Sequence, residues 1–375
     1  MNSITHSIEQ TIRGTAAAAG FAMAGFAPVR RLTEREGFFR EWIDAGRTAE
    51  MAWLARDPER RFDPRRLDPR IRSVVSLAYP YAAPARPACD WRGELRGRIA
   101  AYALGPDYHD TVLASARDVA EAIGAARPGA FTRVYVDTGP VFEREWAIEA
   151  RLGWFGRNTN LIDRYHGSYF FLAEIFTDLE VEPSVEPYRE HCGTCRQCLD
   201  LCPTHALGDG YVLEPRVCIS YLTIEHRGII PRALRPQLGN WVFGCDICQE
   251  VCPWNGDATR AAVPDDRLAP ALAELLALDD DRFRRLYGRT AIRRAKRRGL
   301  ARNAAIALGN SGNPAAIAPL SRALENDPDS LVRAHAAWAL GRFTDADARR
   351  ALAHARSRDA DAIVREEIEA ALCAP

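Results

Sequence analysis

The chain has 375 residues, of which 47% are hydrophobic, so it is long enough for two or three domains that each bury a core of their own. The 50 basic and 50 acidic residues give a formal net charge of zero, which excludes an overall electrostatic preference for nucleic acid or membrane. Eight of the ten cysteines lie between positions 192 and 252, which is the layout of a metal site in a reducing compartment and not of a secreted disulfide framework.

The start of the chain carries no recognisable targeting segment. The sequence MNSITHSIEQ lacks a basic region followed by an apolar core, and no stretch approaches the roughly 18 uninterrupted apolar residues of a membrane span. We therefore expect a complete, cytoplasmic protein that does not contact a membrane.

Residues 1–185 alternate between helical and strand patterns. SIEQTIRGTAAAAG predicts a helix that ends at Gly20, whereas residues 72–81, 131–139 and 168–178 are β-branched and aromatic runs bounded by turn residues. The alternation predicts an α/β (α+β) domain over residues 1–185.

Asp137 follows the predicted strand TRVYV and comes just before Gly139 and Pro140, with VFEREWAIEARLG as the next predicted helix. Enzymes with α/β folds often place catalytic groups at the carboxyl end of a strand, so Asp137 is a candidate catalytic residue. Pro140 also suits the first position of a helix, in which case Asp137 or Thr138 would be only a turn or capping residue. Both interpretations stay open at this point.

Asp107, Tyr108 and His109 open a further predicted helix. Asp107 suits a plain helix cap, and His109 could be a surface histidine or a core histidine whose hydrogen bonds are satisfied. The cobalamin-ligating pattern D-x-H-x-x-G is not completed, because position 112 is Val. A histidine ligand to cobalt is therefore not expected.

Residues 186–260 predict a bacterial-type ferredoxin module with two 4Fe-4S clusters. The first cysteine run has the spacing C-x2-C-x2-C-x3-C-P, in which three thiolates hold one cluster and the fourth ligates the other. The second run lacks a leading cysteine, since position 242 is Val, and Cys218 is the only nearby replacement. If the last cysteine of each run ligates the cluster of the other run, one cluster is bound by Cys192, Cys195, Cys198 and Cys252. The other is then bound by Cys202, Cys218, Cys245 and Cys248.

Two zinc sites are the alternative, because zinc also uses C-x2-C spacing. Triple runs that end in Cys-Pro fit clusters better. Two neighbouring clusters transfer single electrons, so the first domain has to hold a group that accepts them. The isolated Cys89 and Cys373 are expected to be structural or free thiols.

Residues 279–375 predict an all-α domain of HEAT-like repeats. AAIALG at 304–309 returns as AAWALG at 336–341, and Val-Arg at 332–333 returns at 364–365, both after 32 residues. The positions expected on the buried face are Ala307, Leu308, Ala339, Leu340, Ala371 and Leu372. An array of this length is short for a free-standing solenoid, so we expect it to pack against the preceding domain.

Ten basic residues and no acidic one lie between Arg282 and Arg302. They cannot neutralise one another, so they are expected to face solvent or a polyanion. A solvated helix face remains the simpler interpretation. The candidate phosphate contacts in this run are Arg293, Arg294, Lys296, Arg297 and Arg298.

Several long segments together resemble the epoxyqueuosine reductase family, and the resemblance covers nearly the whole chain. Its central motif is VDTGPVFEREWAIEARLGWFGRNTNLI at 136–162. The others are ALGPDYH at 103–109, HCGTCRQCLDLCPTHAL from 191, CISYLTIEHRG from 218 and WVFGCDICQEVCPWN at 241–255.

The resemblance implies reduction of epoxyqueuosine to queuosine at the wobble position of tRNA, with electrons passing from two 4Fe-4S clusters to cobalamin in the first domain. It implies that Asp137 is the proton donor and that Asp107 and His109 lie near the substrate. The residues implied near the corrinoid are Arg61, Asp137, Asn158, Ser168, Ser220, Tyr221 and Thr223. The implied partners are tRNA and an unidentified electron donor, and a monomer is expected.

The chemistry agrees with this assignment, because loss of an epoxide oxygen as water needs a strongly reducing centre and an acid. Asp137 would have to be protonated near neutral pH, which burial against the corrin would favour by raising its pKa. Two alternatives remain. A dehalogenase-like corrinoid enzyme would not need the basic tail and is usually exported, and a ferredoxin-like electron carrier would not need the large first domain.

Overall fold

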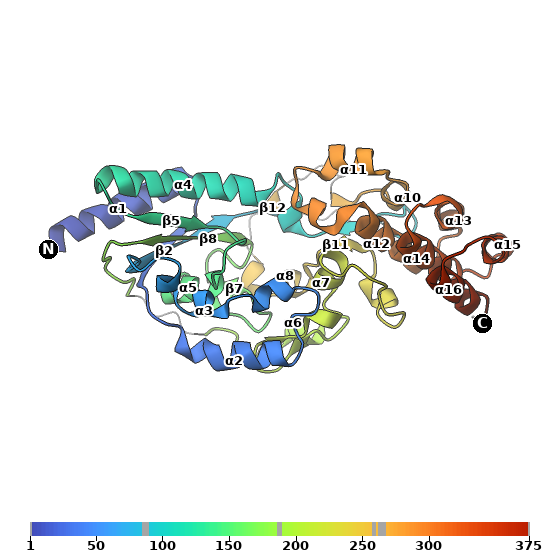
Figure 1. The fold of residues 1–375 in the computed structure, drawn as a ribbon, viewed down its shortest axis with the longest axis horizontal. Helices are drawn as coiled ribbons and strands as arrows, with labels where there is room; N and C mark the ends of the chain where they lie inside the picture. Colours follow the sequence, from blue (N-terminus) through green and yellow to red (C-terminus); the bar gives the residue numbers. More distant parts are fainter. Residues whose placement is uncertain (1, 85–89, 186–189, 257–259, 262–267, 374–375) are drawn as a thin grey trace. The chain divides into compact units, whose positions relative to one another are not determined.

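The computed structural model describes residues 2–84, 90–185, 190–256, 260–261 and 268–373 (Figure 1). It forms two compact units: the first unit comprises Met1–Ala83, Pro106–Pro215 and Ile247–Thr259, and the second comprises Pro84–Gly105, Arg216–Asp246 and Arg260–Pro375. Both units include part of the cysteine-rich region, so the functional division into 1–185, 186–260 and 279–375 stays a prediction. Cys89 lies outside the described residues. Among those residues, no helix combines the length and apolar character needed to cross a bilayer.

The first unit is built on a four-stranded sheet in the order β1-β2-β8-β5, in which all neighbouring strands run antiparallel. The strands are β1 (Met23–Pro28), β2 (Ser73–Pro80), β5 (Thr132–Tyr135) and β8 (Phe170–Thr177). The three strands that the sequence predicts are confirmed. β1 was not predicted, because its small residues give little strand signal. At Gly25 a Cβ would lie 2.1 Å from the carbonyl oxygen of Ala150, so this strand needs glycine where a helix end packs against it.

Helices cover both faces of this sheet. Successive side chains of each strand point to opposite faces, so apolar residues on both faces need a helix to bury them. On one face, α1 (Asn2–Ala18) and α4 (Tyr108–Ala126) pack against Val75 and Ile175, and Figure 1 draws these two helices side by side. On the other face, α5 (Glu143–Glu149) packs its Trp146 against Val74. The mixed helix and strand class is confirmed, and the antiparallel pairing makes it an α+β arrangement.

Shorter elements complete the first unit. Two helices lie between β1 and β2: α2 (Thr33–Asp44) and α3 (Pro58–Phe62). Two more, α6 (Gln197–Asp200) and α8 (Ile247–Glu250), lie within the two cysteine runs. The remaining strands and turns of 3-10 helix are η1 (Ala52–Ala55), η2 (Pro64–Arg66), β6 (Trp154–Phe155), β7 (Leu161–Ile162), β9 (Leu207–Gly208), β10 (Val212–Leu213) and η6 (Pro253–Asn255).

The second unit is mostly helical. Its helices are α7 (Ile219–Ile224), α10 (Leu272–Leu276), α11 (Asp280–Tyr287), α12 (Lys296–Ser311), α13 (Ile317–Asn326), α14 (Ser330–Leu340), α15 (Ala346–Arg356) and α16 (Ala362–Cys373). Its 3-10 turns are η3 (Ala101–Ala103), η5 (Arg235–Leu238), η7 (Ala291–Ala295) and η8 (Pro314–Ala316), and its strands include β4 (Arg98–Ile99) and β11 (Trp241–Phe243). At or across the unit boundaries lie β3 (Ala83–Pro84), η4 (Pro215–Val217) and β12 (Arg260–Ala261).

The 32-residue repeat is visible as a repeated close contact between helices. A Cβ at Gly309 of α12 would lie 2.8 Å from Ala339, and one at Gly341 would lie 2.6 Å from Ala371 of α16, so both contacts recur at the same offset. Four of the six predicted face positions are fully buried, namely Ala307, Leu308, Ala339 and Leu340. The other two, Ala371 and Leu372 on α16, are only half-buried.

The repeats are joined to earlier residues inside the second unit. Arg302 of α12 is fully buried and donates to the carbonyl oxygens of Leu222, His226 and Gly228 at 2.6–3.1 Å. Within the second unit the array therefore packs against residues 222–228, while packing against a separate preceding domain stays a prediction. The expectation that every basic residue from Arg282 to Arg302 faces solvent or a polyanion is wrong for Arg302, because this guanidinium holds main-chain oxygens in the interior.

Candidate active site

A cavity of about 950 Å³ lies in the first unit. Its walls come from α2, α3, the loop after β5, the start of α5, and residues on both sides of β6 and β7. Much of the lining is aromatic, with Phe38, Phe39, Trp42, Phe142 and Phe155 among it. The polar groups on the walls include Arg61, Asp137, Glu143 and Ser168. The structure thus brings three residues predicted from the sequence, Arg61, Asp137 and Ser168, into one cavity.

Asp137 is placed by a strained turn and not by a helix cap. Its φ is +56°, and the N–H of Thr138 donates to the Val136 carbonyl at 2.6 Å, which closes a three-residue turn around Asp137. A left-handed conformation at a non-glycine residue typically costs on the order of 1–3 kcal/mol. Helix α5 begins only at Glu143, and Phe142 at its N-cap makes no side-chain cap. The capping interpretation of Asp137 and Thr138 is therefore wrong.

The Asp137 carboxylate has two partners on α4. Tyr108 donates its hydroxyl to Oδ2 at 2.8 Å, and Nε2 of His109 lies 2.9 Å from the same oxygen. Asp107 is buried, caps α4 through the N–H of His109, and holds Nδ1 of that ring at 2.6 Å. Asp107 is thus both a helix cap and an anchor for the His109 ring. The Asp137 side chain itself is 53% exposed in the chain alone.

The pKa of His109 is raised above its ordinary 6.5, first by the hydrogen bond to Asp137 and then, against the opposing effect of burial, by Asp107. Because the folded-state pKa is the higher one, the pair stabilises the fold fully below about pH 6.5 and loses that contribution as pH rises through the raised value. We expect Asp137→Asn to lower the titration midpoint of His109 in an NMR titration. Asp110→Asn, an exposed neighbour on the same helix, should leave the midpoint unchanged. An equal shift in both variants would contradict the assigned cause.

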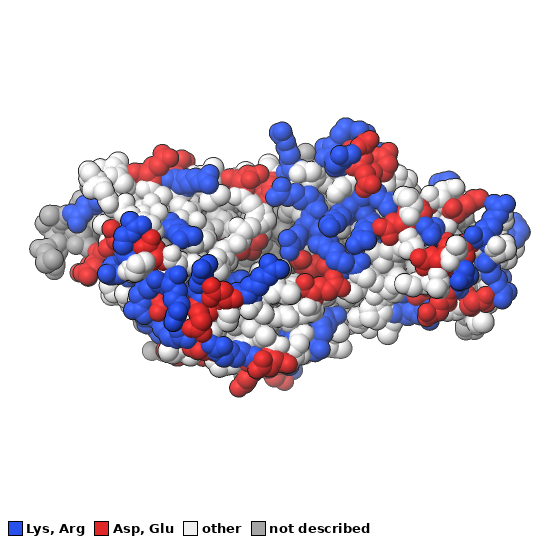
Figure 2. Space-filling view, viewed as in Figure 1, with Lys and Arg blue, Asp and Glu red and all other residues white. Residues whose placement is uncertain are grey.

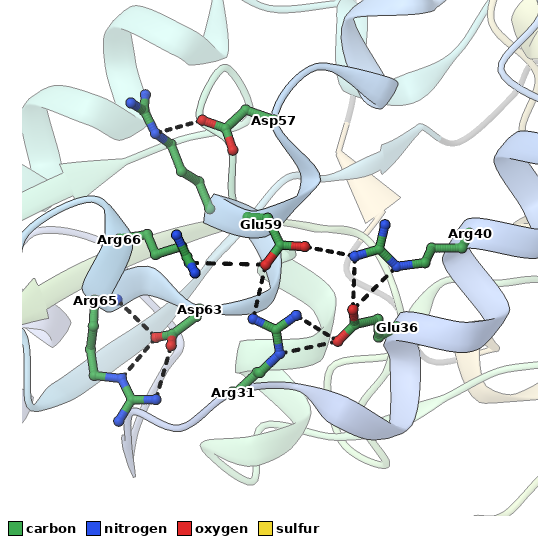
Figure 3. A network of polar contacts seen from close by, with 9 residues as sticks. Arg31, Glu36, Arg40, Asp57, Glu59, Asp63, Arg65 and Arg66 are labelled. Atoms are coloured by element: carbon green, nitrogen blue, oxygen red, sulfur yellow. Dashed lines mark hydrogen bonds and ion pairs between the residues drawn. The ribbon is translucent and has the colours of Figure 1, made fainter.

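A network of alternating charges holds α2 and α3 together at the cavity wall (Figure 3). Arg31 and Arg40 each bridge the carboxylates of Glu36 and Glu59 at 2.6–3.0 Å. Both guanidinium groups also lie over the ring of buried Phe62, at 5.7 and 5.3 Å. Helix α2 has no fully buried residue, so these contacts, together with its aromatic side chains, fix its place. Exposed ion pairs are individually weak, but a network of this kind positions a helix.

Arg61 of α3 has hydrogen-bonding capacity to spare. The residue is 6% exposed, and its Nε is buried with no hydrogen-bond partner in the described part of the chain. One terminal nitrogen reaches the Gly139 carbonyl at 3.5 Å, the long limit of a hydrogen bond. Burial lowers the pKa of this guanidinium. A buried arginine with an unused donor is suited to an acceptor group on a bound molecule.

Four of the predicted cluster ligands gather in a second, much smaller pocket of the first unit. This gap of about 20 Å³ is lined by residues that include Cys192, Cys195, Cys198 and Cys252. Burial, and after it the charges of Cys252, Cys192 and Cys195, raises the pKa of the Cys198 thiol to about 11. The arrangement favours the predicted first cluster.

The second predicted ligand set is divided between the units. Cys202 and Cys248 belong to the first unit, whereas Cys218 and Cys245 belong to the second, so this set stays a prediction. Asn158, predicted near the corrinoid, lines the small cysteine pocket, and its Nδ2 donates to the Cys248 carbonyl at 3.3 Å.

Three further residues predicted near the corrinoid, Ser220, Tyr221 and Thr223, lie on α7 of the second unit. Thr223 is fully buried there, and its hydroxyl accepts from the N–H of Gly244 at 2.9 Å. Their roles toward cobalamin stay predictions.

The cavity and the small cysteine pocket are neighbours within the first unit. Trp154 lines the cavity, Trp254 lines the pocket, and the two rings meet edge to face with centroids 5.1 Å apart. Residues 157 and 158 line the pocket, while residues 159–161 line the cavity. The wall of the cavity is therefore continuous with the wall of the cysteine pocket.

The basic run divides into structural and surface residues. Arg297 is only 6% exposed and forms a two-pronged ion pair with Asp327 at 2.8 and 2.9 Å, so its prediction as a phosphate contact is withdrawn. Arg294 pairs with Glu225 at the surface. Figure 2 shows blue side chains gathered around the place where Figure 1 labels α11 and α12, and exposed basic residues occur in α11, in η7 and between them. We call Arg285, Arg289, Arg293 and Lys296 the basic surface.

Comparison with known proteins agrees with these sites. A family model described as "Epoxyqueuosine reductase QueG, DUF1730" matches residues 61–138, a range that starts at Arg61 and ends just past Asp137. A model for a 4Fe-4S double cluster binding domain matches residues 191–255, and a model for HEAT repeats matches 289–373. The double-cluster match confirms the ferredoxin-type module and sets the zinc alternative aside.

Several similar proteins and solved structures are named epoxyqueuosine reductase. Proteins named epoxyqueuosine reductase from Xanthomonas campestris pv. campestris and Pseudomonas aeruginosa are 40% and 39% identical, covering 88% and 89% of this chain and 94% of each relative. A solved epoxyqueuosine reductase with an epoxyqueuosine-modified tRNA-Tyr stem loop superposes with a TM-score of 0.90 at 28% identity, over 98% of both chains. The Streptococcus thermophilus enzyme gives a TM-score of 0.89 at 28% identity, over 97% of this chain and 98% of that one. On this combination of sequence, fold and site, the chain belongs to the epoxyqueuosine reductase family of oxidoreductases.

Proposed function

We propose that this enzyme reduces epoxyqueuosine to queuosine at the wobble position of tRNA, with two 4Fe-4S clusters passing electrons to cobalamin bound in the cavity of the first unit. The observation that carries the proposal is the placement of Asp137 on the wall of a large cavity that adjoins the cysteine pocket. The tRNA stem loop held by a solved relative supports the substrate. A tRNA substrate also favours the cytoplasm as the place of reaction.

The residues of the cavity fit a corrinoid. Its volume and aromatic lining suit a large, flat macrocycle, and Arg61 offers a spare buried donor to an acceptor on its edge. Ser168 is held in place by Gln249 and Asn255 at 2.9–3.1 Å and presents a fixed polar group on the same wall. Cobalamin bound there would supply a strongly reducing electron pair, replenished one electron at a time through the clusters.

Residues of the chain would donate and transfer the protons. Removing the epoxide oxygen consumes two electrons and two protons, leaves a carbon–carbon double bond and releases water. Asp137 would give a proton to the departing oxygen. His109 contacts the same carboxylate oxygen and would return a proton to it, while Asp107 keeps the imidazole ring in line. Tyr108 fixes the orientation of the Asp137 carboxyl.

The direct test is turnover with the full set of cofactors. Protein purified without oxygen, loaded with cobalamin and supplied with a chemical reductant should convert epoxyqueuosine in undermodified tRNA to queuosine, as read by mass spectrometry of the nucleosides. Protein that holds both clusters and reduced cobalamin but leaves epoxyqueuosine intact would contradict the proposal.

We further propose that the basic surface grips the phosphate backbone of the tRNA. Arg285, Arg289, Arg293 and Lys296 are all exposed and lie close together in the sequence. Replacing all four by Gln should raise KM for tRNA and flatten the dependence of affinity on salt, since each phosphate that is no longer neutralised lowers the slope by up to about 0.9. Binding measured between about 50 and 200 mM salt checks both effects.

A matched control lies in the same repeats. Replacing Arg322, Arg342, Arg349 and Arg358, all exposed and outside the basic surface, removes the same charge from elsewhere on the array. The control should keep nearly the wild-type slope. If both quadruple variants lose the same amount of affinity, the basic surface has no special role and only the overall charge matters.

A further inference from the structure

Glu143 is a polar residue on the cavity wall that the proposed chemistry does not use. It is the first residue of α5, and its side chain reaches back over the loop so that Oε1 accepts the backbone N–H of Asp137. That N–H belongs to the central residue of the strained three-residue turn. The contact therefore holds the one residue of the loop whose conformation is intrinsically unfavourable.

Other contacts join the loop to Arg61 and to helix α4. The Gly139 carbonyl receives a long contact from Arg61, and the Asp137 carboxyl reaches Tyr108 and His109 on α4. A Cβ at Gly139 would lie 2.2 Å from the Tyr135 ring, so the loop folds tightly back on its own strand. In the Bacillus subtilis epoxyqueuosine reductase, a solved structure has the catalytic aspartate loop swung out of the active site. That relative shows that such a loop can occupy two positions.

We propose that Glu143 is a positioning residue that latches the Asp137 loop in its working conformation through the backbone hydrogen bond it accepts. It stabilises the turn from the helix side, where α5 is fixed by buried Trp146 and Ala147. The Asp137 carboxyl then stays within reach of both His109 and the cavity. The inference rests on the proposed role of Asp137 as proton donor.

The protonation state of Glu143 determines which substitutions test the proposal. Burial, and after it the charge of Asp137, raises the pKa of Glu143 to about 8. The residue is then a neutral acid at pH 7, and a carboxylic acid accepts a hydrogen bond through its carbonyl oxygen as an amide does. Glutamine therefore imitates it in size, charge and acceptor, while alanine removes the acceptor. Helix α5 offers a control in Glu149, which pairs with Arg30 at 3.0 Å.

The experiment compares Glu143→Ala, Glu143→Gln, Glu149→Ala and Glu149→Gln in the full enzyme. We expect Glu143→Ala to lower kcat roughly 10²-fold, the scale of a misplaced catalytic group, with little change in KM for tRNA. Glu143→Gln should stay within about threefold of wild type, since it keeps the acceptor. Hydrogen exchange of the 136–142 segment, followed by mass spectrometry, should accelerate in Glu143→Ala only. Iron content and melting temperature verify that every variant is folded.

Each result decides the matter. Fast exchange and low kcat in Glu143→Ala, with both restored in Glu143→Gln, support the latch. Unchanged exchange in Glu143→Ala overturns it, and so does a kcat as low in Glu143→Gln as in Glu143→Ala, which would make Glu143 a proton-transfer group. Hydrogen exchange is measured without substrate, so it tests the role of Glu143 independently of turnover. A wild-type enzyme that does not reduce epoxyqueuosine in tRNA would contradict the proposed function without affecting that test.

Discussion

Asp137→Asn is expected to keep both clusters and cobalamin but to lower turnover by about 10²- to 10⁴-fold, the usual contribution of a general acid. An asparagine side chain keeps the size and can still accept from Tyr108, so the loop geometry should survive. It cannot deliver a proton to the departing oxygen or receive one from His109. Single-turnover assays on epoxyqueuosine-containing tRNA measure the loss, and the cobalamin absorption spectrum checks that the cofactor is held.

The matched control is Asp110→Asn, which removes an exposed carboxylate one residue from His109. It should turn over like the wild type. If Asp137→Asn also stayed within a few-fold of wild type, Asp137 would be only a turn residue, and the acid would have to be sought elsewhere on the cavity wall.

Cys252→Ser is expected to abolish turnover and to lower the iron content from about eight atoms per chain to about four. Cys252 lines the small cysteine pocket with three cysteines of the first run, although it follows them by 54 to 60 positions in the sequence. A serine oxygen is a poor ligand for cluster iron, so the cluster in that pocket should be lost or converted. Iron analysis and electron paramagnetic resonance of reduced protein measure the change.

Cys218→Ser tests the second ligand set by the same measurements. If Cys218 completes the other cluster, its variant should also fall to about four iron atoms, and its reduced spectrum should differ from that of Cys252→Ser. Cys373→Ser, at an exposed position on the last helix, should leave iron unchanged. Full iron content in Cys218→Ser would mean that another residue completes the second cluster.

Local patterns in the sequence determined much of this protein. β-branched runs between turn residues identified β2, β5 and β8, because that signal depends only on neighbouring residues. Cysteine spacing predicted the double-cluster module, since ligands on one tight loop share a cluster. The 32-residue repeat predicted the helical array, and the recurrent glycine–alanine contacts at Gly309 and Gly341 are the packing behind it.

Features that depend on contacts between residues distant in the sequence could be determined only from the tertiary structure. The sequence left Asp137 open between a cap and a catalytic residue; the start of α5 at Glu143 removes the cap, and the approach of α4 supplies its partners. The sequence predicted that the whole basic run is exposed. Arg297 and Arg302 are buried instead, because Arg297 pairs with an acidic residue and Arg302 with main-chain carbonyls that are distant in the sequence. Glu143 carried no signal at all. Its role depends on a side chain folding back over a turn, which is a property of the assembled loop and not of any spacing along the chain.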